Sequence, residues 1–205
     1  MIFETIVVGS MEVNCYILAS GKNRKAFIID PGDDEIKIRK VLDRYDLHPA
    51  AVINTHGHFD HIGCDDAFGV PVCIHSQDAG MLVDSKRNYS AFLASPFRVK
   101  SEIKELEDKQ KITLEDLELE VRHIPGHTHG GIALVLKKPQ EKIVFSGDSL
   151  FWGSIGRTDL GGDEKLLVRS IKDKLLSLSD DTVVYPGHGP ATSIGEEIAN
   201  NPFLK

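Results

Sequence analysis

Four short segments rich in histidine and aspartate constrain what this chain can fold into. The first is the run His-Gly-His-Phe-Asp-His at residues 56–61, and the other three place His127, Asp148 and His188 beside a glycine. Seven nitrogen and oxygen ligands are too many for one tetrahedral ion, but they suit two ions that share a carboxylate. The fold must therefore bring these four segments together, although long stretches of chain separate them.

The first segment has a local geometry suited to metal binding. His56 and His58 stand two residues apart at the end of a predicted strand, so their side chains leave the same face. Asp60 and His61 follow where the chain is expected to turn into a helix. Packing three histidines and an aspartate this closely has a desolvation cost that a bound cation offsets. A lone Pro-Gly-His is usually a turn with a surface histidine, but beside this cluster the later turns become candidates for the missing ligands.

Bulk composition sets wider bounds. The chain has 205 residues, 41% of them hydrophobic and 27% charged, which predicts one domain spanning residues 1–205. A net charge of −7 argues against a nucleic-acid partner, because phosphate binding relies on clustered Lys and Arg. The N-terminus lacks a secretory pattern, and no apolar run approaches the ~20 residues of a membrane helix. Three cysteines (Cys15, Cys64, Cys73) without a Cys-x-x-Cys pair indicate no disulfide framework. We therefore expect a cytoplasmic protein.

Hydrophobic periodicity predicts two groups of strands. The first group comprises strands at 2–8, 13–19, 25–29, 50–54 and 72–75, with helices at 35–45, capped near Asp33 or Asp34, and at 77–82. The second comprises strands at 111–114, 118–123, 132–136, 143–145 and 183–185, turns at 115–116 and 139–141, and helices at 165–178 and 193–199. Residues 84–98 have no clear period and are expected to form a loop or lid. This order favours two sheets packed face to face with helices outside.

The ligand pattern resembles the metallo-β-lactamase fold superfamily. The run at 56–61 is followed in order by His127, Asp148 and His188, and the turn at 30–32 (Asp-Pro-Gly) belongs to the same likeness. Residues 153–159 (Gly-Ser-Ile-Gly-Arg-Thr-Asp) and 201–203 (Asn-Pro-Phe) are similar to the small, single-domain glyoxalase II-like, or hydroxyacylglutathione hydrolase-like, metallohydrolases. The resemblance implies an α/β fold: a four-layer αββα sandwich of two mixed β-sheets with helices on the outer faces.

Residue roles follow from the same resemblance. It implies one ion held by His56, His58 and His127, and a second held by Asp60, His61 and His188, with Asp148 bridging the two. Two divalent ions are expected, with zinc as the first expectation and iron or manganese also compatible with these ligands. The implied reaction is hydrolysis of a thioester by a hydroxide between the ions, and Asp60 would also orient this hydroxide.

The resemblance leaves alternatives open. β-Lactamases of this fold usually lack a histidine at the position of His61, and many use cysteine in place of Asp148. Full-length glyoxalase II has an added C-terminal domain that binds glutathione, whereas here 17 residues follow His188, so the natural substrate stays open. One alternative is a mononuclear iron persulfide dioxygenase, which shares the fold and a Gly-Arg-Thr-Asp segment. Another, from a different class, is a non-catalytic binding module scaffolded by metal.

Candidate substrate contacts lie near these segments. Arg157 follows the Asp148 turn in a glycine-rich loop, His129 stands two residues after His127, and Tyr89 lies in the predicted loop or lid. The expected partner is a small molecule, and neither nucleic acid nor membrane is expected. The sequence does not fix the oligomeric state.

Overall fold

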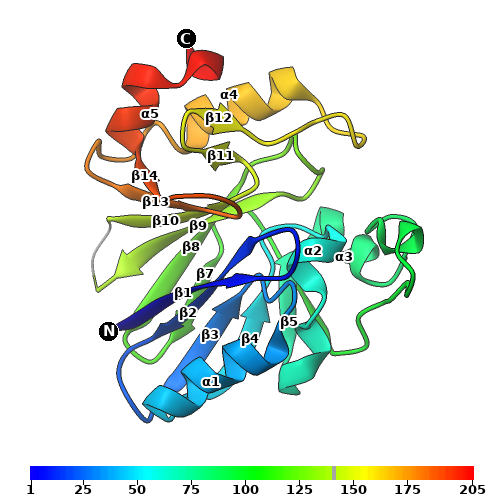
Figure 1. The fold of residues 1–205 in the computed structure, drawn as a ribbon. Coiled ribbons are helices and arrows are strands. Elements are labelled where there is room, and N and C mark those ends of the chain that lie inside the picture. Colours follow the sequence, from blue (N-terminus) through cyan, green and yellow to red (C-terminus); the bar gives the residue numbers. More distant parts are fainter. Residues whose placement is uncertain (140–141) are drawn as a thin grey trace.

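Two six-stranded sheets pack face to face, with helices on both outer faces (Figure 1). The computed structural model describes residues 1–139 and 142–205. Both sheets contain parallel and antiparallel pairs. The architecture confirms the predicted four-layer αββα sandwich.

The first sheet is built from the N-terminal half of the chain in sequential order. Strands β1, β2 and β3 are antiparallel neighbours, and β3 to β6 are parallel. Their bounds are β1 Ile2–Val8, β2 Val13–Ala19, β3 Lys25–Ile29, β4 His48–Ile53, β5 Val72–His75 and β6 Ile103–Leu106. Because β3, β4 and β5 are parallel, their carboxyl ends lie at one edge of the sheet, where β4 leads into the histidine run.

The second sheet has the order β14-β13-β10-β9-β8-β7. Strand β10 pairs in parallel with β13, and the other pairs are antiparallel. The bounds are β7 Lys111–Leu114, β8 Leu117–His123, β9 Ile132–Lys138, β10 Ile143–Gly147, β13 Val183–Pro186 and β14 Thr192–Ser193. A small hairpin follows β10, formed by β11 (Leu150–Phe151) and β12 (Ser154–Ile155).

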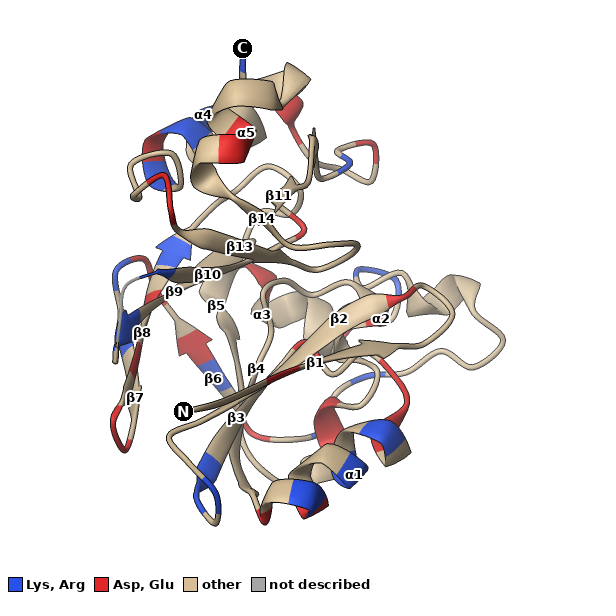
Figure 2. Cartoon of the chain, turned by 60° about the vertical axis from the view of Figure 1, so that its left-hand side comes forward, with Lys and Arg blue, Asp and Glu red and all other residues tan. Residues whose placement is uncertain are grey.

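Helices cover the outer faces of both sheets. The first sheet is covered by α1 (Glu35–Tyr45) and flanked by α2 (Phe59–Ile62) and α3 (Ser76–Leu82), while α4 (Glu164–Lys174) and α5 (Ile194–Asn200) cover the second. Short 3₁₀ turns lie at η1 (Asp65–Phe68), η2 (Ser90–Phe92) and η3 (Pro202–Leu204). Lys and Arg are interspersed with Asp and Glu along α1 and α4 (Figure 2). None of the helices in the described parts of the chain is long and apolar enough to cross a bilayer.

Three apolar layers hold the sandwich together. The layer between the sheets includes Phe27, Leu119 and Phe145. A second layer joins α1 to the first sheet, and a third, containing Leu167 and Ile171, joins α4 to the second sheet. The alternation of inward and outward side chains along the strands supplies both faces of each sheet.

Hydrogen bonds tie the two sheets at the site edge. Tyr16 Oη donates to the Pro186 carbonyl at 2.6 Å, and Asn14 Nδ2 donates to the same carbonyl at 2.9 Å. Val13 and His188 form an isolated antiparallel bridge. The turn that carries His188 is thereby fixed to the first sheet as well as to its own.

Most predicted elements are confirmed, and the differences have local causes. The second long helix ends at Lys174, whereas the prediction placed its end at residue 178. The prediction was too long because Leu176 and Leu178, which lie in a turn after the helix, pack on the same core and continue its apolar spacing. Strand β6 was not predicted, since Lys104 and Glu105 interrupt its apolar pattern. The strand expected at 50–54 runs from 48 to 53, and the turn expected at 139–141 lies largely outside the described residues.

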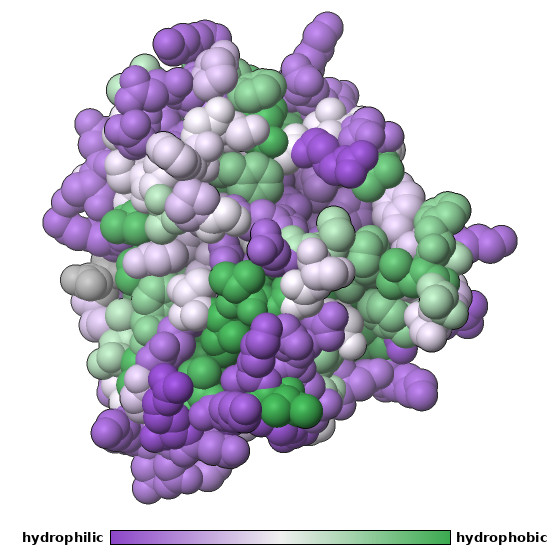
Figure 3. Space-filling view, in the orientation of Figure 1, coloured by the Kyte–Doolittle hydropathy of each residue, from purple (hydrophilic) through white to green (hydrophobic). Residues whose placement is uncertain are grey.

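Segment 84–98 contains the short turn η2 and otherwise follows an irregular path, as predicted for a loop. Its Phe92 is 82% exposed and Leu93 is 39% exposed. The space-filling view shows apolar residues gathered on the right-hand side of the molecule, where Figure 1 draws the segment that follows α3 (Figure 3). We name residues 84–98 the aromatic loop.

Candidate metal centre and flanking cavities

All seven predicted ligand residues lie at one edge of the sandwich, between the two sheets. His56 and His58 follow β4, and the short helix α2 carries Asp60 and His61. The second sheet supplies the other three from the turns that follow β8, β10 and β13, namely His127, Asp148 and His188. Each half of the chain thus contributes part of the site.

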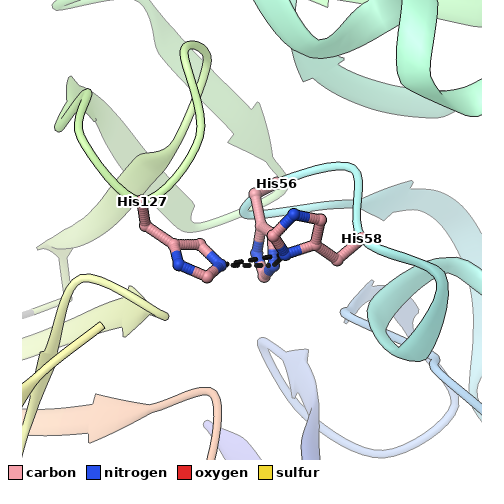
Figure 4. A group of neighbouring side chains, drawn as sticks. All are labelled: His56, His58 and His127. Atoms are coloured by element: carbon pink, nitrogen blue, oxygen red, sulfur yellow. Dashed lines mark hydrogen bonds between the residues drawn. The ribbon is translucent and has the colours of Figure 1, made fainter. Parts of the chain in front are cut away.

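A first cluster consists of three imidazole nitrogens (Figure 4). His56 Nε2 lies 3.1 Å from His58 Nδ1, and His127 Nε2 lies 3.3 Å and 3.0 Å from these two atoms. A tetrahedral ion with metal–nitrogen distances of about 2.0–2.1 Å separates its ligand atoms by about 3.3 Å. The three nitrogens therefore have the spacing that one such ion requires.

A second cluster lies beside the first. His61 Nε2 is 3.4 Å from His188 Nε2, and Asp60 Oδ2 is 3.4 Å and 3.9 Å from His188 Nε2 and His61 Nε2. This set of two imidazoles and one carboxylate is wider than the first, and it also suits a divalent ion.

Asp148 lies between the clusters. Its Oδ2 is 3.7 Å from His127 Nε2 in the first cluster, and its Oδ1 is 3.5 Å from His61 Nε2 in the second. Oδ1 is buried and accepts no hydrogen bond from the described residues. A buried carboxylate oxygen without a donor has a high free energy unless a cation is close. The donor set therefore fits two metal ions that share Asp148.

Outer contacts orient the imidazole rings. His127 Nδ1 donates to the Arg157 carbonyl at 2.7 Å, and His188 Nδ1 donates to the Met11 carbonyl at 2.9 Å. A ring nitrogen that faces a carbonyl must carry the proton, so the Nε2 lone pair of each ring points into its cluster.

Asp30 lies next to the second cluster and contacts one of its histidines. Its Oδ2 lies 3.1 Å from His61 Nδ1, and the Thr55 backbone N–H and hydroxyl each donate to its carboxylate at 2.7 Å. Asp30 is almost fully buried. It thus joins the orientation of His61 to the strand end that carries His56.

Asp78 in α3 supports the first cluster. Its Oδ1 accepts the Gly130 N–H at 2.7 Å, and its Oδ2 accepts the Gly57 N–H at 3.2 Å. One buried carboxylate therefore holds the loop of His56 and His58 against the loop of His127.

The surroundings lower the pKa of two predicted ligand histidines and raise the pKa of a third. Burial lowers the pKa of His56 well below its usual value and lowers the pKa of His58 to about 3, so both rings are neutral and available as ligands at neutral pH. Burial also disfavours the charged form of His61, but the carboxylates of Asp148 and Asp30 outweigh it and raise the pKa to about 10. The pKa of Asp60 is lowered, despite burial, by the neighbouring His188 and His61.

Two cavities open onto these clusters. The central cavity, of about 300 Å³, is lined by Asp60, Asp148 and His188, together with the predicted contacts Tyr89 and Arg157. A side cavity of about 220 Å³ lies next to it and contains the predicted contact His129. All three predicted substrate contacts thus line a cavity at the site.

Tyr89 and Arg157 differ in how they are held. Tyr89 Oη donates to the Leu160 carbonyl at 2.8 Å, and its ring lies 5.4 Å from the His58 ring. It therefore joins the aromatic loop to the loop after β12. The Arg157 guanidinium forms a paired hydrogen bond with Asp159, at 2.7 Å and 2.6 Å, so part of its charge is already balanced.

A match to a family model identifies the superfamily of this chain. The model described as the metallo-beta-lactamase superfamily matches residues 8–188, a range that contains all seven clustered side chains. The chain belongs to this superfamily. It is a family of metallo-hydrolase-type enzymes.

Two curated superfamily relatives align over the whole chain and over 98% of their own length. One is the probable metallo-hydrolase YqgX of Bacillus subtilis, at 36% identity, and the other is the hydroxyacylglutathione hydrolase GloC of Haemophilus influenzae, at 35% identity. These relatives are similar in length to this chain.

Solved structures of superfamily members show the same fold. BLEG-1, described as a B3 metallo-beta-lactamase, is 40% identical with a TM-score of 0.92, and covers 100% of both chains. TTHA1623, solved in a di-iron-bound form, is 35% identical with a TM-score of 0.83, covering 98% of this chain and 100% of its own. ETHE1 from Myxococcus xanthus is 27% identical with a TM-score of 0.78, covering 98% and 84%.

Supporting residues of this superfamily site were missed from the sequence. The Asp-Pro-Gly turn at 30–32 was noticed without a role for Asp30, and Asp78 was not singled out. A carboxylate that binds backbone N–H groups has no fixed spacing from the ligands it supports, so the sequence carries little signal for Asp78. The position of Asp30 at the end of a buried strand, beside β4, is the one available hint.

Proposed function

We propose that this chain is a dinuclear metal-dependent hydrolase, acting as a single unit over residues 1–205, and that its substrates are thioesters of the hydroxyacylglutathione type. The observation that carries the proposal is the position of Asp148 between two clusters of imidazole and carboxylate ligands. Similarity over the full chain to a hydroxyacylglutathione hydrolase supports the substrate class. We assign the ligands as His56, His58 and His127 for one ion, Asp60, His61 and His188 for the other, and Asp148 for both.

The chain's own groups prepare the site for hydrolysis. Two bound divalent ions, with zinc as the first candidate, would supply Lewis acidity and lower the pKa of water toward neutrality. Asp148 fixes the separation of the two ligand sets. Asp60 is ionised at neutral pH and has an oxygen at the site, so it can accept a hydrogen bond from the attacking water and orient it. No side chain is required as the nucleophile.

The central cavity suits a small acyl group. Its wall combines the ligand residues with the apolar side chains Met11, Phe151 and Leu160. These groups exclude bulk water from the reacting carbonyl, which strengthens electrostatic interactions there. The predicted contacts Arg157 and Tyr89 lie on the same wall.

The three cysteines are unpaired, and a cytoplasmic setting remains part of the proposal.

Elemental analysis of protein purified without added metal, combined with a substrate panel, tests this function. We expect two metal ions per chain and hydrolysis of S-lactoylglutathione or a simpler acyl thioester. Asp148→Asn should lose metal and activity together, while His48→Ala, at an exposed position outside the site, should keep both. Fully metallated protein that cleaves no thioester would contradict the proposal.

β-Lactam hydrolysis is a second candidate function. The sequence alone counted against it, but a solved structure described as a B3 metallo-beta-lactamase is 40% identical over the whole chain. A penicillin and a cephalosporin therefore belong in the substrate panel. Cleavage of these compounds at a kcat/KM above that for every thioester would favour this candidate.

A mononuclear iron persulfide dioxygenase is the third candidate. A neighbour at 35% identity was solved with iron bound, which supports iron as the metal, although that neighbour holds two iron ions. The histidines of the first cluster with Asp148 are sufficient for one iron. One iron per chain, with oxygen uptake on glutathione persulfide, would replace the hydrolase proposal. If protein with two bound metal ions is inactive toward thioesters, β-lactams and glutathione persulfide, the non-catalytic binding module is the function that remains.

A further inference from the structure

The side cavity carries a cation that the proposed chemistry does not use. The side cavity and the central cavity are neighbours, because His58, Tyr89, His127 and Leu160 line both. Arg87, from the aromatic loop, and His129 line the side cavity but not the central one. A substrate whose carbonyl lies at the clusters can therefore extend a side arm toward Arg87.

The guanidinium of Arg87 has no direct carboxylate partner among the described residues. Its side chain is exposed. The pKa of Asp84 is lowered mainly by the Lys86 backbone N–H, and the charges of Arg98 and Arg87 add to this lowering. Asp78 lines the same cavity, but both of its oxygens accept backbone N–H groups. Arg157, by contrast, is paired with Asp159.

The guanidinium of Arg87 packs directly against a glycine of helix α3. This residue is Gly80, where an added Cβ would overlap Arg87 Nη1. A glycine at this position leaves space for the flat guanidinium over the helix. The planar fork of an arginine matches a carboxylate in two parallel hydrogen bonds, and a fixed fork loses less conformational entropy on binding.

We propose that Arg87 is a specificity-determining residue that binds a carboxylate on the substrate. The inference rests on the proposed thioester hydrolysis and adds the substrate class: thioesters with a carboxylate on a short arm. A cavity of about 220 Å³ holds about seven waters at ~30 Å³ each, so the arm in the cavity has a similar number of non-hydrogen atoms. The carboxylate can belong to the thiol half or to the acyl half.

Matched substrates separate these two sources. S-acetyl-3-mercaptopropionate carries the carboxylate on the thiol half, S-ethyl monothiosuccinate carries it on the acyl half, and S-ethyl thioacetate is neutral. For the metallated protein we expect kcat/KM to be about tenfold higher for one anionic substrate than for the neutral one. Arg87→Gln should lower this ratio about tenfold, mainly through KM, and Arg87→Lys should retain part of it.

A second variant, Gly80→Ala, displaces the Arg87 guanidinium from helix α3 but keeps its charge. Gly80→Ala displaces the end of a flexible side chain and places a better helix former in α3, so the melting temperature should not fall. The ratio of anionic to neutral kcat/KM should still decrease. Arg98→Gln is the matched control, because Arg98 lines a different cavity together with Ile62 and Lys100.

Binding of a compound that cannot be hydrolysed keeps the inference testable apart from the reaction. 3-(Methylthio)propionate, titrated by NMR, should bind wild-type protein at least fivefold more tightly than Arg87→Gln protein, and more tightly than its neutral amide. A protein that cleaves no thioester but shows this difference overturns the proposed function alone. An unchanged ratio and unchanged binding in Arg87→Gln overturn the role of Arg87, whatever the activity.

Discussion

Gly187 lies so close to Asp148 that a Cβ atom at position 187 would overlap Asp148 Oδ1. The glycine before His188 therefore makes room for the carboxylate that stands between the clusters. We expect Gly187→Ala to displace Asp148 and to lower the metal content below two ions per chain, with a loss of activity of more than tenfold. Gly21→Ala, at an open turn, is the matched control. Metal analysis after gel filtration measures the effect, and full occupancy in Gly187→Ala would contradict it.

Asp30 gives a prediction about the second cluster alone. In Asp30→Asn the amide would face donors from Thr55, and the support of His61 would weaken. Loss of a partner that orients a ligand typically lowers metal affinity about 10- to 100-fold. In a chelator titration, one ion should be removed at a lower chelator concentration than in the wild type, and the other at the same concentration. Asp43→Asn, at an exposed position of α1, should leave both steps unchanged.

The protonation of His61 predicts how metal affinity depends on pH. Its folded-state pKa of about 10 lies above neutral pH, so an ion that takes the Nε2 lone pair must displace a proton. Affinity of the second cluster should therefore rise with pH, by about tenfold per unit for one proton, between roughly pH 7 and pH 9. His56 and His58 are already neutral there and release none. Proton release on metal addition in weakly buffered solution measures the difference, and no release would contradict it.

Tyr89 predicts the behaviour of the aromatic loop. Tyr89→Phe keeps the ring beside His58 but removes the hydrogen bond to the Leu160 carbonyl. The loss should cost about 1 kcal/mol of folding free energy and free the aromatic loop. We expect KM to rise a few-fold with kcat nearly constant, together with faster amide exchange in residues 84–98. Unchanged exchange would show that the hydrogen bond does not restrain the loop.

The Asn-Pro-Phe ending has a structural explanation. Asn201 Nδ2 donates to the Ser154 carbonyl at 3.0 Å and to Glu197 Oε2 at 2.7 Å, and Glu197 also accepts the Gly153 N–H. Both side chains are buried. Asn201→Ala should lower the free energy of unfolding by about 2–3 kcal/mol, measured by urea denaturation. Asn200→Ala, which removes one exposed hydrogen bond, should change it by less than about 0.5 kcal/mol.

The sequence predicted the parts of the fold with strong local patterns. Strands at 2–8, 13–19 and 25–29 match their observed bounds, because each is a run rich in β-branched and other apolar residues that is flanked by turns containing Gly, Ser or Asn. The clustering of the histidines was also anticipated, since a strand end beside a glycine is visible in sequence. The supports Asp30 and Asp78 and the cation Arg87 were not, because their roles depend on which loops the tertiary fold places together.

Neither half of the chain can form either cluster alone. The first cluster needs His127 from the second sheet, and the second cluster needs His188 from the same sheet. A bound ion therefore acts as a cross-link between the two layers, and high affinity requires that they have already docked. The metal content of a preparation should consequently report the fraction of native molecules in it, which makes metal analysis a test of folding quality as well as of chemistry.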